Sequence, residues 1–501
     1  MTTDERATGT PSEAQLTGLG DMDAAEFRAA AHAAVDRMAD YLESVAVRPV
    51  LPPIEPGSLR DLFPESAPEA PESLDAILAD YDRLVEPNAT HWQHPGFMAY
   101  FASSASSAGI LGEMLVAALN QNPMLWRTSP IGTELEVVVV DWLRRGLGLP
   151  DGFEGLLTDT ASTSSLIALA AAREAAGTQA ATAGLAARDD LHALRVYASA
   201  EAHSSIEKAC MTLGLGRASL VRIPVNERFE LMPHALEAAI AADRAAGRTP
   251  IAIVATLGTT SSTSVDPVSA VAAIAEREGI WLHVDAAYAG AVALLPERRS
   301  HFEGWERADS IVVNPHKWLF TPVDASLLLT RRLDQLSAAF SLHPEYLRTL
   351  DRATPVRDFT DLTPQLGRRM RALKLWIELR WFGLEGLRRR IGHHIELARE
   401  LADAVDADQD WERLAPVPFS TVCLRWRPAR LAESAVDDAN AAIMDAVNRS
   451  GEVFLSHTRL DGRFTIRVAI GNLRTERRHV ERAWELLREA ARTVGEDADL
   501  P

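Results

Sequence analysis

The chain has 501 residues, of which 47% are hydrophobic, enough for more than one domain with its own core. Its formal net charge of -19 argues against nucleic acid as a partner, because the phosphates would be repelled. The two cysteines, Cys210 and Cys423, lie far apart in unrelated patterns, so the sequence predicts neither a disulfide framework nor a thiolate metal site.

The amino-terminal region predicts a helix followed by an extended arm. Residues 27–45 have the apolar spacing of an amphipathic helix, and residues 48–71 are rich in proline. Prolines at that density exclude a helix. The extended stretch is either a plain linker or an arm that lies on a partner subunit. No basic-then-apolar leader opens the chain and no apolar run reaches the length of a bilayer span, so we expect a cytoplasmic protein with no membrane contact.

From about residue 110 to residue 331, short β-branched runs alternate with helical segments such as residues 267–278. This alternation predicts an α/β fold, with a mainly parallel sheet covered by helices on both faces. Ligands of such sheets bind where the strands end. The predicted strands are residues 195–198, 219–223, 251–255, 280–284, 310–313 and 325–329.

The last part of the chain predicts a smaller α+β domain. A long helical region follows Leu366 to about residue 405, and residues 421–426 and 464–470 have the pattern of strands. His393 and His394 in this helical region face different directions, so we expect both to be solvated and predict no metal site.

A lysine and an aspartate each follow a predicted strand, with a helix-length crossover between them. Lys317 lies in Asn314-Pro315-His316-Lys317-Trp318, and Asp285 follows the apolar strand that ends at Val284. Alone, the lysine is equally a side chain that snorkels from a strand end, and the aspartate a turn or capping residue. Together they suit pyridoxal 5'-phosphate (PLP), which needs an amine to form a Schiff base with its aldehyde and a carboxylate to keep its ring nitrogen protonated.

Other polar residues near predicted strand ends have both a functional and an ordinary interpretation. Ser162 lies in a run of small hydroxylated residues that starts a helix and offers donors to a phosphate, although such caps are common. His203 either stacks on a flat ring or caps a helix, and Thr260 is a ligand or a turn residue. Tyr346 opens a long polar segment, typical of a lid, and either returns a proton to a carbanion or lies on the surface.

Taken together, these motifs resemble those of the group II PLP-dependent decarboxylases, most closely the aromatic L-amino-acid decarboxylases. The resemblance implies a fold-type I, aspartate-aminotransferase-like architecture with a seven-stranded, mainly parallel sheet. It also implies a homodimer with active sites at the interface, built from an arm over 1–106 that packs on the partner, a large PLP-binding domain over 107–374 and a small domain over 375–501. The matching motifs are residues 55–57, 90–92, 99–101, 133–136, 202–205, 255–260, 283–290, 314–318 and 366–369.

The resemblance also implies roles for individual residues. Lys317 is expected to be the Schiff-base lysine, Asp285 the partner of the ring nitrogen and His203 the ring-stacking histidine. Tyr346 is expected to protonate the substrate carbon from a mobile loop, so it joins these three as catalytic residues. The expected phosphate ligands are Ala161, Ser162 and Asn314, and Thr260 and His316 match positions that contact cofactor and substrate.

An aromatic amino acid is the predicted substrate, converted to the corresponding arylalkylamine and CO₂. Gly367 should leave room for a bulky ring, and the resemblance implies an indolic substrate because plant relatives with such substrates carry glycine there; this favours tryptophan over phenylalanine, tyrosine or L-dopa. The chain departs from animal relatives at Ala102, where they carry proline, and at Met124, where they carry an aromatic residue. The predicted substrate-binding residues are Trp92, Tyr100, Phe101, Ala102, Met124, Leu125, His203 and Gly367.

Several other functions remain open on the sequence. An aromatic aldehyde synthase would use oxygen to convert the same substrate to an aldehyde, and Tyr346 argues against it because such enzymes usually carry phenylalanine there. A decarboxylase of a non-aromatic amino acid, an aminotransferase and a carbon–sulfur lyase are further alternatives. A catalytically inactive binding protein is opposed by the joint presence of Lys317, Asp285, His203 and Tyr346.

Overall fold

The computed structural model describes residues 13, 20–186, 188–342 and 356–498. Its large domain is built on a seven-stranded sheet of order β1-β7-β6-β5-β4-β2-β3. β7 is antiparallel to both of its neighbours, and the other pairs are parallel. The mainly parallel sheet is therefore confirmed. The strands are β1 (Glu154–Thr158), β2 (Leu194–Ser199), β3 (Leu220–Ile223), β4 (Thr249–Thr256), β5 (Trp281–Asp285), β6 (Ser310–Val313) and β7 (Ser326–Thr330).

Six of these strands match the sequence pattern, and β1 is the one that the pattern missed. β1 reads Glu-Gly-Leu-Leu-Thr, with a glycine and a single β-branched residue, so its composition is not that of a strand. It forms because its backbone pairs with β7 along its whole length, from Glu154 opposite Thr330 to Thr158 opposite Ser326. Tertiary pairing therefore overrides a weak local preference at the edge of the sheet.

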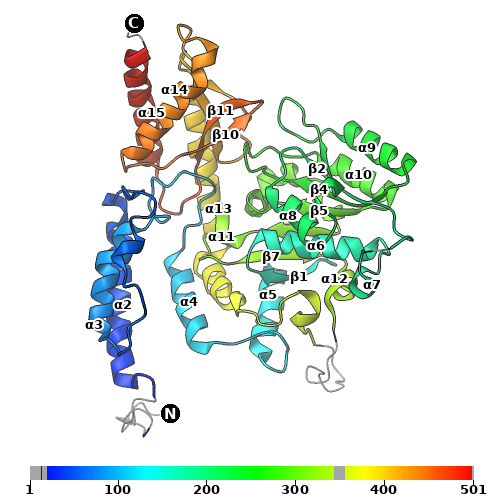
Figure 1. Cartoon of the computed structure of the whole chain (residues 1–501), viewed down its shortest axis with the longest axis horizontal. Coiled ribbons are helices and arrows are strands. Elements are labelled where there is room, and N and C mark those ends of the chain that lie inside the picture. Colours follow the sequence, from blue (N-terminus) through cyan, green and yellow to red (C-terminus); the bar gives the residue numbers. More distant parts are fainter. Residues whose placement is uncertain (1–12, 14–19, 187, 343–355, 499–501) are drawn as a thin grey trace.

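Helices cover both faces of the sheet, as Figure 1 shows. Strand side chains alternate between two cores: in β4, Ile253 and Ala255 face one and Ala252 and Val254 face the other. The first core contains residues of α5 (Pro130–Gly146), α9 (Pro233–Ala245), α10 (Val268–Glu278) and α13 (Arg371–Asp406). The second contains residues of α6 (Ala161–Ala175), α8 (Ser204–Thr212) and α12 (Leu333–Phe340).

A smaller domain follows the large one, as predicted. Its antiparallel sheet has the order β10-β11-β9-β8 and is covered by α14 (Glu433–Arg449) and α15 (Arg477–Ala498). α13 joins the two domains and has a kink at Gly383, where φ is 63°. The strands are β8 (Trp411–Arg413), β9 (Thr421–Trp426), β10 (Ser456–Leu460) and β11 (Arg463–Ala469), of which the pattern predicted β9 and β11.

The predicted amino-terminal helix is also confirmed, as α2 (Ala24–Ser44). With α3 (Leu74–Asp80) it extends along one side of the molecule, away from the large domain (Figure 1). The proline-rich stretch between them contains only a short 3-10 turn over Arg60–Leu62. α4 (Ser107–Leu119) leads from this arm into the large domain and packs on α13.

The expectation that both histidines of α13 are solvated is wrong for His394. His393 is exposed, but His394 is buried and accepts a 2.9 Å hydrogen bond from the indole Nε1 of Trp318. Burial lowers the pKa of His394 to about 3, so the ring is neutral and can accept this bond. Helix α13 is covered by both domains, which the sequence pattern of one helix does not reveal.

A buried acid on α13 holds the segment that carries Lys317 in place. Glu378 accepts hydrogen bonds from the hydroxyls of Ser106, at 2.5 Å, and Thr321. Ser106 also donates its backbone N–H to the carbonyl of Phe320. Burial raises the pKa of Glu378 to about 7, and Lys374 acts in the opposite direction. One carboxyl group therefore ties α13, the start of α4 and the turn after Lys317 together.

We predict that Glu378→Gln changes how stability depends on pH. Because the pKa of Glu378 is raised in the folded state, the folded protein binds this proton more tightly than the unfolded chain does. Protonation of Glu378 therefore stabilises the folded protein; this contribution is fully present below pH 4.5 and is lost as pH rises past about 7. The loss amounts to about 3 kcal/mol at most. Urea midpoints at pH 5.5 and pH 8 should fall less with pH in the amide variant than in the native protein. An identical pH dependence would contradict the prediction.

Candidate active site

A cavity of about 200 Å³ lies where β4 and β5 end, beside the first turns of α6 and α8. Parallel strands place their carboxyl ends at the same edge of a sheet, which is why residues far apart in the sequence meet there. All eight residues predicted to bind the cofactor line this chamber: Ala161, Ser162, His203, Thr260, Asp285, Asn314, His316 and Lys317.

Lys317 lies in the single-turn helix α11 (Pro315–Trp318), which directly follows β6. Its backbone N–H donates to the carbonyl of Asn314, and its Nζ lies 5.3 Å from the ring centroid of Phe101. Burial lowers the pKa of the Lys317 amine, while the charge of Asp285 acts to raise it. A lowered pKa increases the fraction of the amine that is unprotonated, which is the nucleophilic form.

Asp285 is the last residue of β5 and is buried. Its Oδ1 accepts a 3.1 Å hydrogen bond from the backbone N–H of Ala287, which fixes the orientation of the carboxylate. In the sheet it lies opposite Thr256 of β4 and Val312 of β6. The carboxylate of Asp285 lines the chamber.

His203 caps a helix, which is one of its two predicted interpretations, and it also lines the chamber. It is the N-cap of α8, where its Nδ1 accepts the backbone N–H of Ser205 at 3.1 Å and lies 2.8 Å from the Ser205 hydroxyl. Burial lowers the pKa of the imidazole, so the ring is neutral. Because Nδ1 accepts a hydrogen bond, Nε2 carries the proton. The cap therefore fixes both the tautomer and the position of the ring at the chamber wall.

The tautomer of His316 determines which way the Asn314 amide points. The Nδ1 of His316 accepts the backbone N–H of Ala325 at 3.0 Å, and burial lowers its pKa to about 4, so Nε2 of the neutral ring is a donor. Asn314 places Nδ2 3.3 Å from that Nε2 and leaves Oδ1 without a partner among the described residues. Exchanging the amide oxygen and nitrogen satisfies both groups. The NH₂ group is then free to donate into the chamber.

Sequence reasoning missed several residues that line the chamber. The hydroxyl of Thr256 is buried and has no hydrogen-bond partner in the part of the chain that the structure describes, so it has a donor available for a ligand. The sequence could have indicated Thr256 by its position at the end of a strand, where it lies opposite Asp285 in the sheet. Tyr288 stacks between Phe101, with centroids 3.8 Å apart, and Trp318, at 4.5 Å. The residues missed are Thr160, Thr256, Gly258, Ala287 and Tyr288.

The predicted substrate residues separate into two groups. Phe101 lines the chamber, and with Tyr100 it also lines an adjoining cavity of about 300 Å³. Trp92 stacks on Tyr100, with centroids 6.4 Å apart. Ala102 is buried in a small apolar cluster with Phe97 and lines neither cavity.

The second group lies elsewhere in the chain. Asn122 accepts the backbone N–H of Arg368, so the turn that carries Met124 and Leu125 packs on the segment that carries Gly367. None of these three predicted residues lines the two cavities of a single chain. Tyr346 lies outside the described residues.

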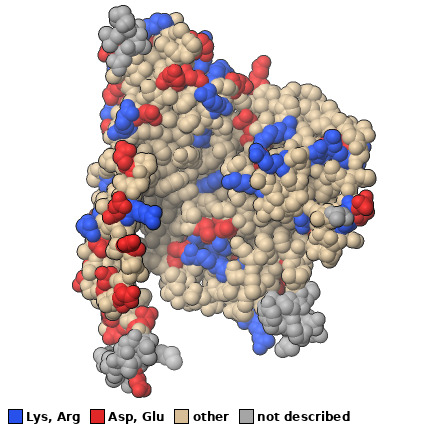
Figure 2. All heavy atoms as spheres, viewed as in Figure 1, with Lys and Arg blue, Asp and Glu red and all other residues tan. Residues whose placement is uncertain are grey.

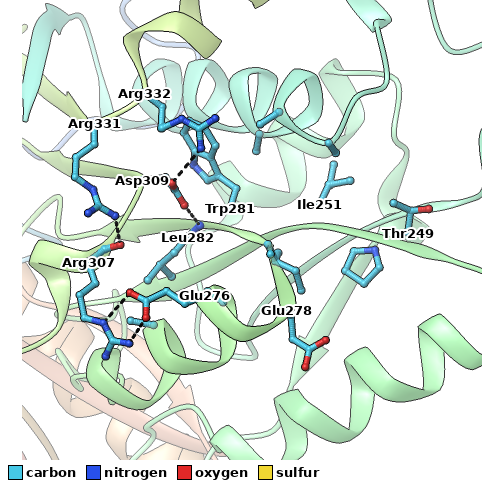
Figure 3. Close-up of a pocket in the computed structure, with 18 of the residues that line it drawn as sticks. Thr249, Ile251, Glu276, Glu278, Trp281, Leu282, Arg307, Asp309, Arg331 and Arg332 are labelled. Atoms are coloured by element: carbon cyan, nitrogen blue, oxygen red, sulfur yellow. Dashed lines mark hydrogen bonds and ion pairs between the residues drawn. The ribbon is translucent and has the colours of Figure 1, made fainter.

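A larger cavity, of about 550 Å³, lies at the opposite edge of the sheet, where β4 and β5 begin (Figure 3). Its charged side chains pair with one another: Arg307 binds Glu276, with Nη2 and Oε2 2.5 Å apart, and Arg332 lies 3.8 Å from Asp309. These pairs neutralise much of the charge in the cavity. The smaller chamber, in contrast, keeps a lysine amine, an aspartate and a neutral histidine together.

Known proteins resemble this chain over most of its length. Residues 56–427 match the pyridoxal-dependent decarboxylase conserved domain. This chain belongs to the pyridoxal-dependent decarboxylase family. It is 41% identical to phenylacetaldehyde synthase of Arabidopsis thaliana, over 94% of this chain and 97% of the relative. It is also 41% identical to tryptophan decarboxylase 2 of Oryza sativa subsp. japonica, over 95% and 96%.

The same likeness extends to solved structures. The crystal structure of Oryza sativa TDC with PLP and tryptamine has a TM-score of 0.90 and 38% identity, covering 95% of this chain and 99% of that one. The predicted fold-type I architecture and the predicted family are thus confirmed. The decarboxylase is a PLP-dependent carboxy-lyase, and PLP is its cofactor.

The chamber of this decarboxylase fits the cofactor. Two buried polar groups that line it, the Thr256 hydroxyl and the NH₂ group of the reoriented Asn314 amide, have no hydrogen-bond partner within the described ranges. α6 begins at Ala161 with its free backbone N–H groups at the chamber, which suits a phosphate. Among the described residues no group of three or more His, Cys, Asp or Glu is placed to hold a metal ion, and no helix is long and apolar enough to cross a bilayer.

We predict that borohydride reduction of the PLP-loaded protein attaches the pyridoxyl group to Lys317. The sequence makes the test unambiguous because it contains only three lysines, Lys208, Lys317 and Lys374. Lys374 is buried and ion-paired with Glu113 at 2.8 Å, and Lys208 is exposed on α8. Peptide mass spectrometry should find the label on the Lys317 peptide alone.

Two variants serve as controls for the labelling. Lys317→Arg keeps the positive charge but cannot form the bond, so it should abolish the label. Lys208→Arg should leave the label in place. A pyridoxyl group on the Lys208 or Lys374 peptide of the native protein would contradict the assignment of Lys317.

Proposed function

We propose that this enzyme decarboxylates an aromatic L-amino acid, with tryptophan favoured, to the arylalkylamine and CO₂. The observation that carries the proposal is the chamber in which Lys317 and Asp285 lie beside the aromatic wall of Phe101 and Tyr100. The relatives named above, a tryptophan decarboxylase and an aldehyde synthase of an aromatic substrate, support the aromatic class. Phenylalanine, tyrosine and L-dopa are the competing substrates.

Each chain residue has a proposed task in this reaction. PLP, when bound, supplies a ring that accepts the electrons of the bond to CO₂. Lys317 holds the cofactor before the substrate arrives, and Asp285 keeps a proton on the ring nitrogen. His203, neutral and fixed by its cap, packs against the ring. The stacked rings of Phe101 and Tyr288 exclude water from the reacting atoms.

Other residues are proposed to hold the phosphate and the substrate. Ala161 and Ser162, in the first turn of α6, and Asn314, after β6, are proposed to hold the phosphate, because all three line the chamber. Tyr346 is proposed to return a proton to the substrate carbon, from the resemblance alone. Thr260 and His316 are proposed to contact cofactor and substrate from the chamber wall.

Space at Gly367 supports a bulky ring. A Cβ atom built there would have only the Asn122 Nδ2 within 4 Å, at 3.9 Å, so the position is open. A larger side chain at this position would fill the space. This supports an indole over a single six-membered ring, provided that the segment reaches an active site in the assembled enzyme.

We predict turnover of tryptophan with release of tryptamine and CO₂ in equal amounts, at a higher kcat/KM than for phenylalanine, tyrosine or L-dopa. Gly367→Ser should lower kcat/KM for tryptophan relative to tyrosine by about 10-fold, the effect of a small added group in a pocket. Mass spectrometry of the amines formed from a mixture of amino acids provides the measurement. Activity confined to glutamate or histidine would reject the aromatic class.

An aromatic aldehyde synthase is the second candidate function, because a synthase and a decarboxylase share the same 41% identity with this chain. The two reactions differ in their products. A synthase consumes oxygen and releases peroxide, ammonia and aldehyde together with CO₂. Measuring peroxide and CO₂ in the turnover assay separates them, since peroxide equal to CO₂ would establish the synthase.

We propose further that the enzyme is a homodimer whose arm, residues 1–106, packs on the partner. No residue of α2 is buried, although Phe27 and Val35 are apolar. A helix that buries no apolar face is marginally stable in water, so a second surface is needed to cover it. Figure 2 shows a hollow of largely uncharged surface between the arm and the large domain, which suits a second copy.

α4 continues this apolar surface. Leu111, Leu115 and Leu119 recur every four residues, so they form one stripe, and each is more than half exposed. A stripe of this kind on a helix whose other face already packs on α13 marks a contact with another molecule. A dimer would also explain why Met124, Leu125 and Gly367 line no cavity of a single chain, since they would complete the partner's site.

We predict that Leu115→Glu shifts the protein from dimer to monomer and removes most of its activity, because a charge would be buried at the interface. Sedimentation velocity and the turnover assay measure the two effects. Met211→Glu is the matched control: Met211 is equally exposed but lies on α8, away from α4, so it should change neither. A fully active native monomer would contradict the proposed dimer.

A further inference from the structure

The wall segment, residues 92–105, carries the aromatic wall described above and is held by the small domain. Met98 donates its backbone N–H to the carbonyl of Phe454 at 3.0 Å. The carbonyl of Met98 accepts the backbone N–H of Ala469, the last residue of β11, at 2.9 Å. The small domain therefore carries the aromatic wall, whereas Lys317 belongs to the large domain.

The turn that follows β11 binds the backbone of the wall segment. Asn472 donates from its Nδ2 to the carbonyls of Trp92, at 2.8 Å, and His94, at 3.1 Å. The hydroxyl of Thr475 donates to the carbonyl of Pro95 at 2.7 Å. Because these acceptors are backbone groups, the bonds do not depend on which side chains the wall segment carries at those positions.

Arg474, in the same turn, contacts a side chain of the wall segment instead. Its Nη1 donates to the Oε1 of Gln93 at 2.9 Å. The same Oε1 accepts the backbone N–H of Ala105 at 3.1 Å, and the Gln93 Nε2 donates to the carbonyl of Ala105 at 3.3 Å. One amide group therefore joins the two ends of the wall segment and connects them to the small domain.

The charge of Arg474 fixes the orientation of this amide. A guanidinium group has donors and no acceptor, so it must face the oxygen of Gln93 and not the NH₂ group. The NH₂ group of Gln93 then faces the carbonyl of Ala105, as that bond requires. Burial lowers the pKa of Arg474, and the group that opposes this is the Tyr41 hydroxyl. Among the described residues, the guanidinium of Arg474 has hydrogen bonds with Gln93 only.

Ala105 connects this contact to the segment that carries Lys317. The next residue, Ser106, donates its backbone N–H to the carbonyl of Phe320 at 2.9 Å, in the turn after Lys317. A continuous set of bonds therefore runs from the small domain through Gln93 and Ala105 to that turn. The position of the aromatic wall relative to the Lys317 amine depends on these bonds.

We propose that Arg474 and Gln93 are positioning residues for the aromatic ring of the substrate, an inference that rests on the proposed decarboxylation. Together they hold Phe101, whose ring centroid lies 5.3 Å from the Lys317 Nζ, at the distance that the ring requires. Contacts with the ring are the same before and during the cleavage of the bond to CO₂, so weakening them acts on KM and leaves kcat nearly unchanged. None of the residues proposed to bind PLP lies in the wall segment, so its affinity should not change.

The alternative is that Arg474 stabilises only its own turn. The turn is closed without this side chain, because the backbone N–H of Arg474 donates to the Oδ1 of Asn472 at 2.9 Å and that of Thr475 donates to the Asn472 carbonyl at 3.0 Å. If Arg474 and Gln93 acted separately, the effects of replacing them would add. A shared contact makes the two effects non-additive.

The test is a double-mutant cycle of Arg474→Leu and Gln93→Leu in the PLP-loaded enzyme. Arg474→Leu should raise KM for the best aromatic substrate about 10-fold, the lower end of the effect of a hydrogen bond to a charged group, and change kcat by less than about 2-fold. The double variant should have the KM of Gln93→Leu alone, because both changes remove the same contact. Arg474→Lys keeps the charge and should recover part of the lost affinity.

Hydrogen–deuterium exchange provides a second measurement that does not need turnover. Peptides from the wall segment should exchange faster in Arg474→Leu than in the native protein, while the Kd of PLP stays unchanged and shows that the variant is folded. Arg477→Leu is the matched control, since Arg477 is exposed at the start of α15 and pairs with Glu400. It removes one positive charge without touching the wall segment, so neither KM nor the exchange should change.

The outcomes separate this proposal from the proposed function. Unchanged exchange in Arg474→Leu, additive effects in the cycle, or a fall in kcat with KM unchanged would overturn the role of Arg474 and Gln93. Faster exchange with an unchanged KM would show that the contact holds the wall segment but does not position the substrate, and would also overturn it. A native enzyme that turns over no aromatic amino acid would reject the proposed function itself.

Discussion

Two opposing effects act on the proton of the Lys317 amine. Burial favours the neutral amine, and the carboxylate of Asp285 favours the ammonium. In the proposed reaction the amine must be neutral to form a bond with the cofactor, and the carboxylate must pair with the ring nitrogen. The sheet brings the two groups together because they follow neighbouring strands, β6 and β5, at one edge. The neutral histidines and the stacked rings then shape the chamber around this pair.

Much of this arrangement was predictable because it follows from chain order. Residues that come directly after parallel strands share one edge of the sheet, so Asp285, Asn314 and Lys317 were expected to meet, and they do. Six strands could be read from β-branched runs for the same reason. The number of strands and the fold type came from resemblance, since β1, which contains Gly155, has no strand signal of its own.

What the sequence did not reveal depends on contacts between distant segments. The burial of His394 requires both Trp318 and the second domain to cover α13. That Arg467 has no carboxylate partner among the described residues is visible only when the carboxylates have positions in space. The same is true of Thr256. In the sequence it is one threonine among many, and only the structure shows that it lies opposite Asp285 and that its hydroxyl has no partner among the described residues. Local pattern predicts elements, and packing decides which polar groups stay unsatisfied.

The two connected cavities differ in charge from the surface of the molecule. The chain has a formal net charge of -19, yet among the described residues Asp285 is the one carboxylate that lines them, beside the basic side chains of Lys317 and Arg467. The proposed reaction converts a zwitterion with no net charge into a cationic amine. The net negative charge of the chain attracts that amine within roughly 10 Å, beyond which salt screens the field. The negative surface therefore acts on the proposed product more strongly than on the proposed substrate.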